Sequence, residues 1–246
     1  MADGFITETL DDGTVVLTNY KANAVDVVLP EEVDIIGPRV FFSASKMETL
    51  KLNDRVREIP VDSFCYNIAF LNFIVPETNP YFSQRDGILY SKDGSVMLNY
   101  PPARRDESYV MEEGLLSMRQ SFRYGPRFLK SITTPSSFSE LPDDAFRCSF
   151  TVHTITVKDG PKRIGKRCFS FSTDLVDIIL PQTLEEIDDE AFRGLTSLER
   201  LAIPSSVRRI GAKAFMGCPL LRSIAIPSSC EIESDSFDPD VEVKRV

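Results

Sequence analysis

The sequence has very little histidine, the residue most often used as a general base and as a metal ligand. It has one histidine, His153, between Val152 and Thr154 in a stretch predicted to be a strand. A catalytic triad or a multi-histidine metal site cannot be assembled from it alone, so we interpret it as an ordinary strand residue. The phosphate-binding patterns GxGxxG, GxxxxGKS and GxxxxGKT are also absent. These absences predict a protein that is not an enzyme and that needs no cofactor.

The sequence also lacks segments suited to membranes. It has no apolar run of about 18 residues or more, so we expect no membrane span. Residues 1–13 have neither the basic n-region nor the apolar core of a signal peptide. The net charge of -9 disfavours nucleic acid and anionic lipid as partners, because both are negative. An acidic surface mainly favours solubility, and we expect a monomer.

Cysteine is scarce and shows no metal-binding spacing. The five cysteines include no CxxC pair, which argues against a disulfide framework and a zinc site. Four of them lie within three residues of a recurring phenylalanine, and we expect these to be small buried fillers: Cys65, Cys148, Cys168 and Cys218. The tail offers Asp235, Asp238 and Asp240 as oxygen ligands for calcium, without the spacing or the glycine of an EF-hand. Whether this tail binds calcium stays open.

Against these absences stands an internal repeat. The segment Leu198–Cys218 reads LERLAIPSSVRRIGAKAFMGC, and the residues on either side repeat its scheme at an interval of 23. Each predicted strand is followed by a junction residue, which is proline in six of nine repeats. The junctions are Pro30, Asn53, Pro76, Glu112, Pro135, Lys158, Pro181, Pro204 and Pro227, and only the step from Pro76 to Glu112, of 36, departs from 23. A fixed period of this length predicts a repeat architecture.

The pattern within one repeat has a physical interpretation. Leu201 and Ile203 are two apart in a strand and therefore face the same side, and Pro204 ends the strand because it has no N–H. Val207 and Ile210 follow across a turn. One repeat cannot bury these residues alone, so stacked repeats with parallel strands must share one core. A phenylalanine follows ten or eleven residues after most junctions, and we expect four of these to stack as a buried ladder: Phe146, Phe169, Phe192 and Phe215.

The pattern LxxIxIPxxVxxIGxxAFxGC resembles the BspA-type leucine-rich repeat of surface proteins from oral and gut bacteria, treponemes and trichomonads. The resemblance covers roughly residues 14 to 237. It implies a right-handed, α/β-type leucine-rich-repeat solenoid. A parallel β-sheet would form one face, short helical or 3-10 turns would lie opposite, and a β-hairpin would be inserted.

We expect one domain over residues 1–246. Its predicted parts are a capping hairpin at 5–20, repeats 1–3 at 24–99 with a hairpin insertion near 81–100, repeats 4–9 at 105–237, and a C-terminal strand within 238–246. The insertion is predicted to have two strands, at 87–90 and 95–100. The fourth repeat is the least regular, which predicts a kink near 100–128.

The predicted sheet offers an extended surface. Residues two before each junction are mostly apolar or β-branched, those four before are polar, and both should point outward from about nine strands. We expect apolar anchors and flanking charges in this face to bind a partner, as solenoids commonly do. The candidate residues are Ile179, Thr156, Ala202, Asp177, Arg200, Ile74 and Val110.

Two functional hypotheses follow. The resemblance implies a non-enzymatic surface adhesin or host-interaction module that binds extracellular-matrix or plasma proteins, such as fibronectin or fibrinogen, at the cell surface or after secretion. The absence of a signal peptide leaves a cytoplasmic location as the alternative. The second hypothesis is a small apolar or lipid-like ligand in a pocket near the third and fourth repeats, suggested by Ile74, Val110, Tyr81, Phe82 and Tyr100.

Overall fold

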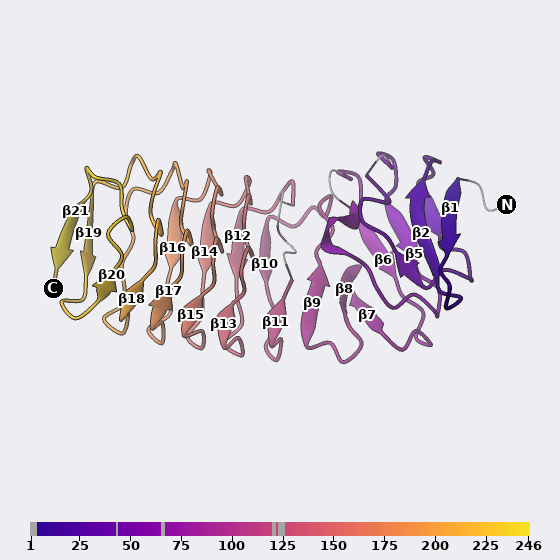
Figure 1. The fold of residues 1–246 in the computed structure, drawn as a ribbon, viewed down its shortest axis with the longest axis horizontal. Coiled ribbons are helices and arrows are strands. Elements are labelled where there is room, and N and C mark those ends of the chain that lie inside the picture. The colour runs from indigo at the N-terminus through magenta and orange to yellow at the C-terminus, as the bar shows by residue number, and fades with distance from the viewer. Residues whose placement is uncertain (1–3, 43, 65–66, 120–121, 123–125) are drawn as a thin grey trace. The chain divides into compact units, whose positions relative to one another are not determined.

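The computed structural model describes residues 4–42, 44–64, 67–119, 122 and 126–246. It divides into two compact units, which we call the first unit (1–104) and the second unit (105–246). Each is built from short strands of successive repeats, and the fold is the predicted right-handed leucine-rich-repeat solenoid (Figure 1). The single domain and the kink near 100–128 concern how the units are joined, and both stay predictions. Cys65 lies outside the described residues.

The first unit begins with the predicted capping hairpin. Strands β1 (Phe5–Thr9) and β2 (Val15–Tyr20) pair antiparallel, and β2 continues in parallel to β4 (Ile35–Ile36). The unit's parallel sheet has the order β3–β5–β6, and Val27, Leu50 and Phe73 face the core as Cα partners. Its strands are β3 (Asp26–Val28), β5 (Thr49–Lys51) and β6 (Asn72–Ile74). The 3-10 helix η1 (Val61–Phe64) is the one helix among the described residues.

The insertion has three strands rather than the predicted two. They are β7 (Phe82–Arg85), β8 (Ile88–Ser91) and β9 (Val96–Asn99), joined antiparallel in that order. The sequence of β7, FSQR, is mostly polar and shows no alternation over several residues, so it gives little strand signal. Phe82 nevertheless anchors it in the core, and the backbone of β7 pairs along the whole length of β8.

The first sheet of the second unit follows the predicted register. Strands β10, β12, β14 and β16 pair in parallel, and each Cα partner lies 23 residues away. The tail supplies the predicted last strand, which pairs in parallel with β19. The strands of this sheet region are β10 (Ser108–Val110), β12 (Ser131–Thr133), β14 (Thr154–Thr156), β16 (Asp177–Ile179), β19 (Ser223–Ile226) and β21 (Glu242–Arg245).

One predicted strand is missing from this sheet. Residues 199–203 form no strand, and none of their backbone groups has a hydrogen-bond partner within the part of the chain described. The strand predicted before Pro204 is therefore absent, and the ladder stops at β16 and resumes at β19. Leu201 still points inward and is 8% exposed, so the core pattern survives the loss of the backbone ladder.

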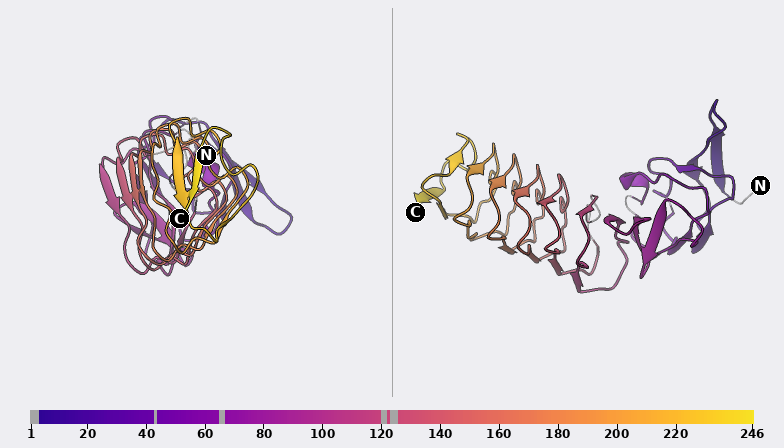
Figure 2. Two further views of the ribbon diagram at one scale, coloured as in Figure 1. Left: turned by 90° about the vertical axis from the view of Figure 1, so that its left-hand side faces the viewer. Right: turned by 90° about the horizontal axis from the view of Figure 1, so that it is seen from below.

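A second parallel sheet runs through the same unit where short helical turns were expected. Its order is β13–β15–β17–β18–β20, and each strand has only two residues. In Figure 2 these strands follow one another along the stacked repeats. The strands are β13 (Glu140–Leu141), β15 (Arg163–Ile164), β17 (Glu186–Ile187), β18 (Arg209–Ile210) and β20 (Glu231–Ile232); the remaining strand is β11 (Ser117–Met118).

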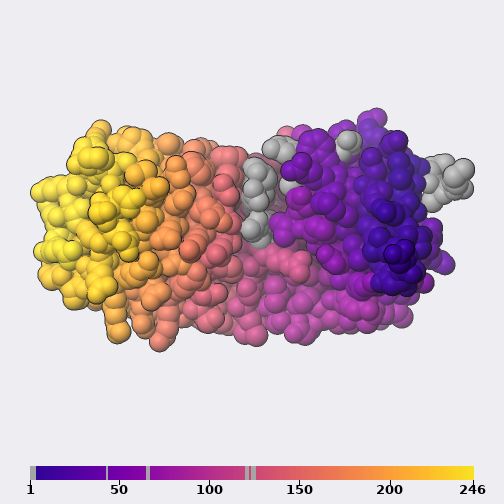
Figure 3. All heavy atoms as spheres, in the orientation of Figure 1, coloured from indigo at the N-terminus to yellow at the C-terminus, as the bar shows by residue number. Residues whose placement is uncertain are grey.

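The predicted phenylalanine ladder forms the centre of the second unit. Phe146, Phe169, Phe192 and Phe215 are each 0% exposed. Their successive ring centroids are 5.4, 5.1 and 4.9 Å apart, and the rings are within 19° of parallel. Phe237 adds a further stacked ring at 5.1 Å. The space-filling view shows the repeats as successive bands of colour in contact with one another (Figure 3).

The turns beside this ladder include left-handed backbone. Cys148, Phe171, Gly194 and Gly217 are equivalent positions with φ of 57°, 61°, 72° and 78°. Glycine suits this region because it has no Cβ, whereas a phenylalanine there is unusual. Cys168 and Cys218 are buried as expected, but Cys148, which occupies one of these left-handed turn positions, is only partly buried.

Candidate protein-binding face

The outer face of the first sheet in the second unit presents one row of apolar and β-branched side chains. Val110, Thr133, Thr156 and Ile179 are successive Cα partners across β10, β12, β14 and β16. Val110 is 62% exposed and Ile179 is 52% exposed, while both threonines are partly buried. Ile132, Ile155 and Ile178, each one residue earlier in its strand, are buried, because neighbouring residues of a strand face opposite sides.

A polar row lies beside it. Asp177 is exposed two residues before Ile179, so both side chains lie on the same side of β16. Val176, one residue earlier and just before the strand begins, is a further exposed apolar side chain, at 47%. The sequence analysis did not select Val176, although it is the one apolar residue at its repeat position in the second unit; the equivalent residues there are Glu107, Lys130, His153, Glu199 and Arg222.

The structure brings together only some of the predicted site residues. Thr156, Asp177 and Ile179 lie on adjoining paired strands. Arg200 and Ala202 are exposed in the next repeat, but they lie in the segment that forms no strand. Ile74 is 45% exposed in the first unit, where Lys51 and Val28 are its row neighbours. The predicted anchors therefore belong to two separate sheets.

The second sheet differs from this face because its arginines form ion pairs with neighbouring carboxylates. The guanidinium of Arg163 lies 2.9 Å from Glu140, 3.2 Å from Asp143 and 2.5 Å from Asp188. Partial burial acts to lower the pKa of Arg163, but hydrogen bonds from its guanidinium to Glu140 and Asp188 raise it overall. Arg167 pairs with Asp144 at 2.9 Å in the same way. These contacts satisfy the charges internally, which makes the first sheet's face the better candidate for a partner.

Residues of the other hypotheses have local roles. Phe82 and Tyr100 are buried in the first unit, whereas Tyr81 is 46% exposed. Ile74 lies in the same unit and Val110 in the second unit, so a ligand pocket formed by these residues stays a prediction. His153 is exposed, and its Nδ1 lies 2.8 Å from the carbonyl oxygen of Thr151.

The acidic tail uses two of its carboxylates for protein contacts. Asp238 accepts hydrogen bonds from the backbone N–H groups of Gly217 and Cys218, and Asp240 lies 3.1 Å from Arg222. Over the described residues, no group of three or more histidine, cysteine or acidic side chains is placed to hold a metal ion. Calcium binding by this tail stays an open question. In that same part of the chain, no helix is long and apolar enough to cross a membrane.

Comparisons with known proteins agree with this architecture. The family model of the BspA type leucine-rich repeat region matches residues 18–85 and 118–243 in six copies. No curated protein matches the sequence. Among solved structures, the pneumococcal vaccine antigen PcpA is similar with a TM-score of 0.53 and 23% identity; the match covers 90% of this chain and 57% of the PcpA chain. This chain thus spans little more than half of that protein.

Two further structures are similar at lower scores. A leucine-rich cell surface protein from Faecalibacterium prausnitzii has a TM-score of 0.49 and 16% identity, with 99% of this chain and 94% of that chain covered. The leucine-rich-repeat protein of T. pallidum has a TM-score of 0.32 and 18% identity, with coverage of 91% and 80%. At these identities the similarity to solved structures concerns the fold alone.

Proposed function

Because the chain belongs to the BspA-type leucine-rich-repeat family, we propose that it is a protein-interaction module that binds its partner on the outer face of the first sheet in the second unit. The row that ends in Ile179 carries this proposal. It combines two strongly exposed aliphatic side chains with threonines on rigidly paired strands, and water-exposed aliphatic groups on a rigid frame are suited to becoming anchors of an interface. Asp177 and Arg200 would orient the partner.

The partner we propose is a protein of the extracellular matrix or plasma, and the role is that of a surface adhesin or host-interaction protein. The family resemblance supports this role, and so does the description of PcpA, a similar fold, as a vaccine antigen. The accompanying location is the cell surface or the secreted fraction. Protease added to intact cells tests the location: loss of the protein supports it, and full protection contradicts it.

The binding face is tested by Ile179→Glu. A charge in place of this anchor should weaken binding to immobilised fibronectin or fibrinogen at least tenfold, about 1.4 kcal/mol. The side chain is half exposed, so the free energy of unfolding should change by no more than about 0.5 kcal/mol. A binding titration and a thermal melt of the same preparation measure both quantities.

Val28→Glu is the matched control. Val28 occupies the equivalent row in the first unit and is 60% exposed. The Val28→Glu variant should bind the immobilised partner as the parent does. If Val28→Glu weakens binding and Ile179→Glu does not, the first unit carries the binding face. If only changes in the hairpin of β8 and β9 abolish binding, the insertion carries the function and the proposal is wrong.

A further inference from the structure

The second sheet ends in an open strand edge at β20. The N–H groups of Glu231 and Glu233 donate to the carbonyl oxygens of Arg208 and Ile210, so these two residues face the neighbouring strand β18. Neighbouring residues in a strand direct their backbone groups to opposite sides, so the N–H and C=O of Ile232 point away from β18. Within the described part of the chain neither group has a hydrogen-bond partner. They are the groups that a further parallel strand would use.

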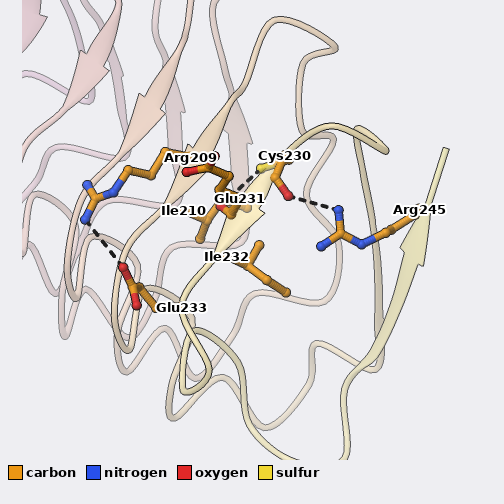
Figure 4. Close-up of a pocket in the computed structure, with 7 residues that line it drawn as sticks. All are labelled: Arg209, Ile210, Cys230, Glu231, Ile232, Glu233 and Arg245. Atoms are coloured by element: carbon orange, nitrogen blue, oxygen red, sulfur yellow. Dashed lines mark hydrogen bonds and ion pairs between the residues drawn. The ribbon is translucent and has the colours of Figure 1, made fainter.

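A groove lies along this edge. Its volume is about 410 Å³, and seven residues line it: Arg209, Ile210, Cys230, Glu231, Ile232, Glu233 and Arg245. Figure 4 shows Arg245 reaching from β21 toward β20. Its Nη1 donates to the carbonyl oxygens of Cys230 and Ser228, both at 2.9 Å. Just before β18 the residue equivalent to Cys230 is Arg208, and its carbonyl accepts a hydrogen bond from the N–H of Glu231 in the next strand. At β20 the guanidinium of Arg245 donates to the carbonyl of Cys230 where the N–H of a next strand would otherwise donate.

The charges of the side chains along the second sheet indicate which kind of strand could pair with β20. The first residues of the five strands are successive Cα partners and alternate in charge: Glu140, Arg163, Glu186, Arg209 and Glu231. Each arginine therefore has a glutamate on both sides. Glu231 ends the series, and among the described residues its carboxylate has no ion-pair partner. The second residue of each strand is leucine or isoleucine; it is buried in the first four strands, and Ile232 of β20 is partly buried.

We propose that the open edge of β20 binds an extended basic–aliphatic peptide, with arginine beside Glu231 and an aliphatic residue beside Ile232, as the next parallel strand of the second sheet. Pairing of backbone groups gives the affinity in such strand addition, and the side chains give the preference. Charge complementarity with Glu231 and continuity with the existing sheet both favour this occupant. Arg245 guards the edge, since it must leave the carbonyl of Cys230 before the peptide can pair there.

The chain itself supplies the probe. Strand β18 lies between two Glu-Ile strands, so its sequence fits beside a third. A fluorescein-labelled peptide VRRIGAK, copied from residues 207–213 and blocked at both ends, is titrated with the full chain and followed by fluorescence anisotropy at physiological salt. Saturable binding is expected. Arg245→Ala should bind the peptide several-fold more tightly, because it frees the carbonyl of Cys230 and removes a like charge.

N-methylation of the peptide separates strand addition from simple attraction to an acidic protein. By the register of β18 and β20, the amides of the second arginine and of the glycine would donate to Cys230 and Ile232. Methylation of these two amides should weaken binding at least tenfold, whereas methylation of the isoleucine amide between them, which faces away, should have a much smaller effect. Equal binding by all three peptides overturns the proposal.

Charge exchange tests the preference. Glu231→Lys should lose affinity for VRRIGAK at least tenfold and gain it for VEEIGAE, with a melt to confirm folding. Ile179→Glu should bind VRRIGAK as the parent does, so this edge and the proposed binding face can fail separately. If Glu231→Lys still prefers the basic peptide VRRIGAK, the proposal is overturned. It is also overturned if neither the parent nor Arg245→Ala binds that peptide.

Discussion

Both units stack aromatic rings in their interiors, but they do so with different regularity. In the second unit the repeats are regular, and one solution recurs: a phenylalanine ring stacks on the ring of the previous repeat, with Phe169 and Phe192 as an example. In the first unit the ring contacts are mixed: Phe41 and Phe64 stack, whereas Phe73 meets Phe64 edge to face. Asparagine side chains also complete backbone hydrogen bonds there. Asn79 is 0% exposed and binds four backbone groups, and the partly buried Asn53 also binds four, one repeat earlier.

This difference shows where each unit is vulnerable. A stack of equivalent rings distributes its contacts over several repeats, so removal of one ring leaves a cavity that its neighbours define. A buried amide serves particular carbonyl and N–H groups, so its loss leaves these groups without partners in the interior. Loss of a ring should lower the free energy of unfolding in proportion to the volume of the cavity it leaves. Loss of a buried amide should lower it in proportion to the number of backbone groups left without a hydrogen bond.

Phe192→Ala is expected to have the largest effect. It removes a fully buried ring between Phe169 and Phe215, and the cavity should lower the free energy of unfolding by about 3–5 kcal/mol. Urea unfolding followed by circular dichroism measures it. Phe171→Gly is the matched control, because this exposed phenylalanine has left-handed backbone that glycine adopts readily. We expect a change within about 1 kcal/mol for the control; similar losses for both variants would contradict the ladder.

Asn79→Ala should be the next largest. Its amide donates to the carbonyls of Asn53 and Val56 and accepts from the N–H groups of Tyr81 and Phe82. Loss of these partners in the interior should cost about 2–3 kcal/mol. Asn23→Ala provides the comparison, since Asn23 accepts one bond from the N–H of Lys46 at the surface, and its removal should cost about 0.5 kcal/mol or less. Equal costs would show that burial of the amide is unimportant.

Asp34→Asn should have the smallest effect and the clearest pH dependence. A hydrogen bond from the N–H of Val15, and then contacts with Arg55, hold the pKa of Asp34 below its ordinary value of 3.8. The folded state therefore gains stability from the ionised carboxylate above pH 3.8, and this gain is lost as the pH falls through the lowered pKa. At pH 7 the variant should be less stable by about 1–2 kcal/mol.

The difference between parent and Asp34→Asn should shrink as the pH falls below 3.8, because the unfolded parent then takes up a proton more readily than the folded parent. Urea midpoints at pH 7, 4 and 2.5 measure it. Asp26→Asn, an exposed aspartate of β3, controls for the general loss of one negative charge. A gap between parent and Asp34→Asn that stays constant down to pH 2.5 would show that the contacts of Asp34 do not depend on its charge.

Much of the fold could be predicted from the sequence because the period is strict. Spacing alone placed Ile155, Ile178 and Phe192 in the core. The second sheet was missed because its strands are two residues long, so Arg209 and Ile210 resemble a turn anchor. The alternating charges 23 residues apart, as at Glu140 and Arg163, were the available signal.

The interruption at residues 199–203 could not be predicted. LERLAIP has the same apolar pattern as the segments that do form strands, and the pattern reports which side chains face inward rather than whether neighbouring backbones come close enough to pair. For the same reason the sequence indicated that Ile179 faces outward but did not show that Arg200 and Ala202 lie outside the ladder. The partner of the binding face depends on surface chemistry that core spacing does not record.

The alternating charges of the second sheet also restrict how a chain of this kind can change its length. Deleting one repeat, such as residues 175–197, would place the strand of Arg163 beside that of Arg209 and set two arginines against each other. Deleting two adjacent repeats would keep every arginine next to a glutamate. In this sheet, charge alternation between neighbouring strands is therefore kept only when repeats are gained or lost in pairs, 46 residues at a time. We expect insertions and deletions of an even number of repeats to be tolerated better than those of an odd number.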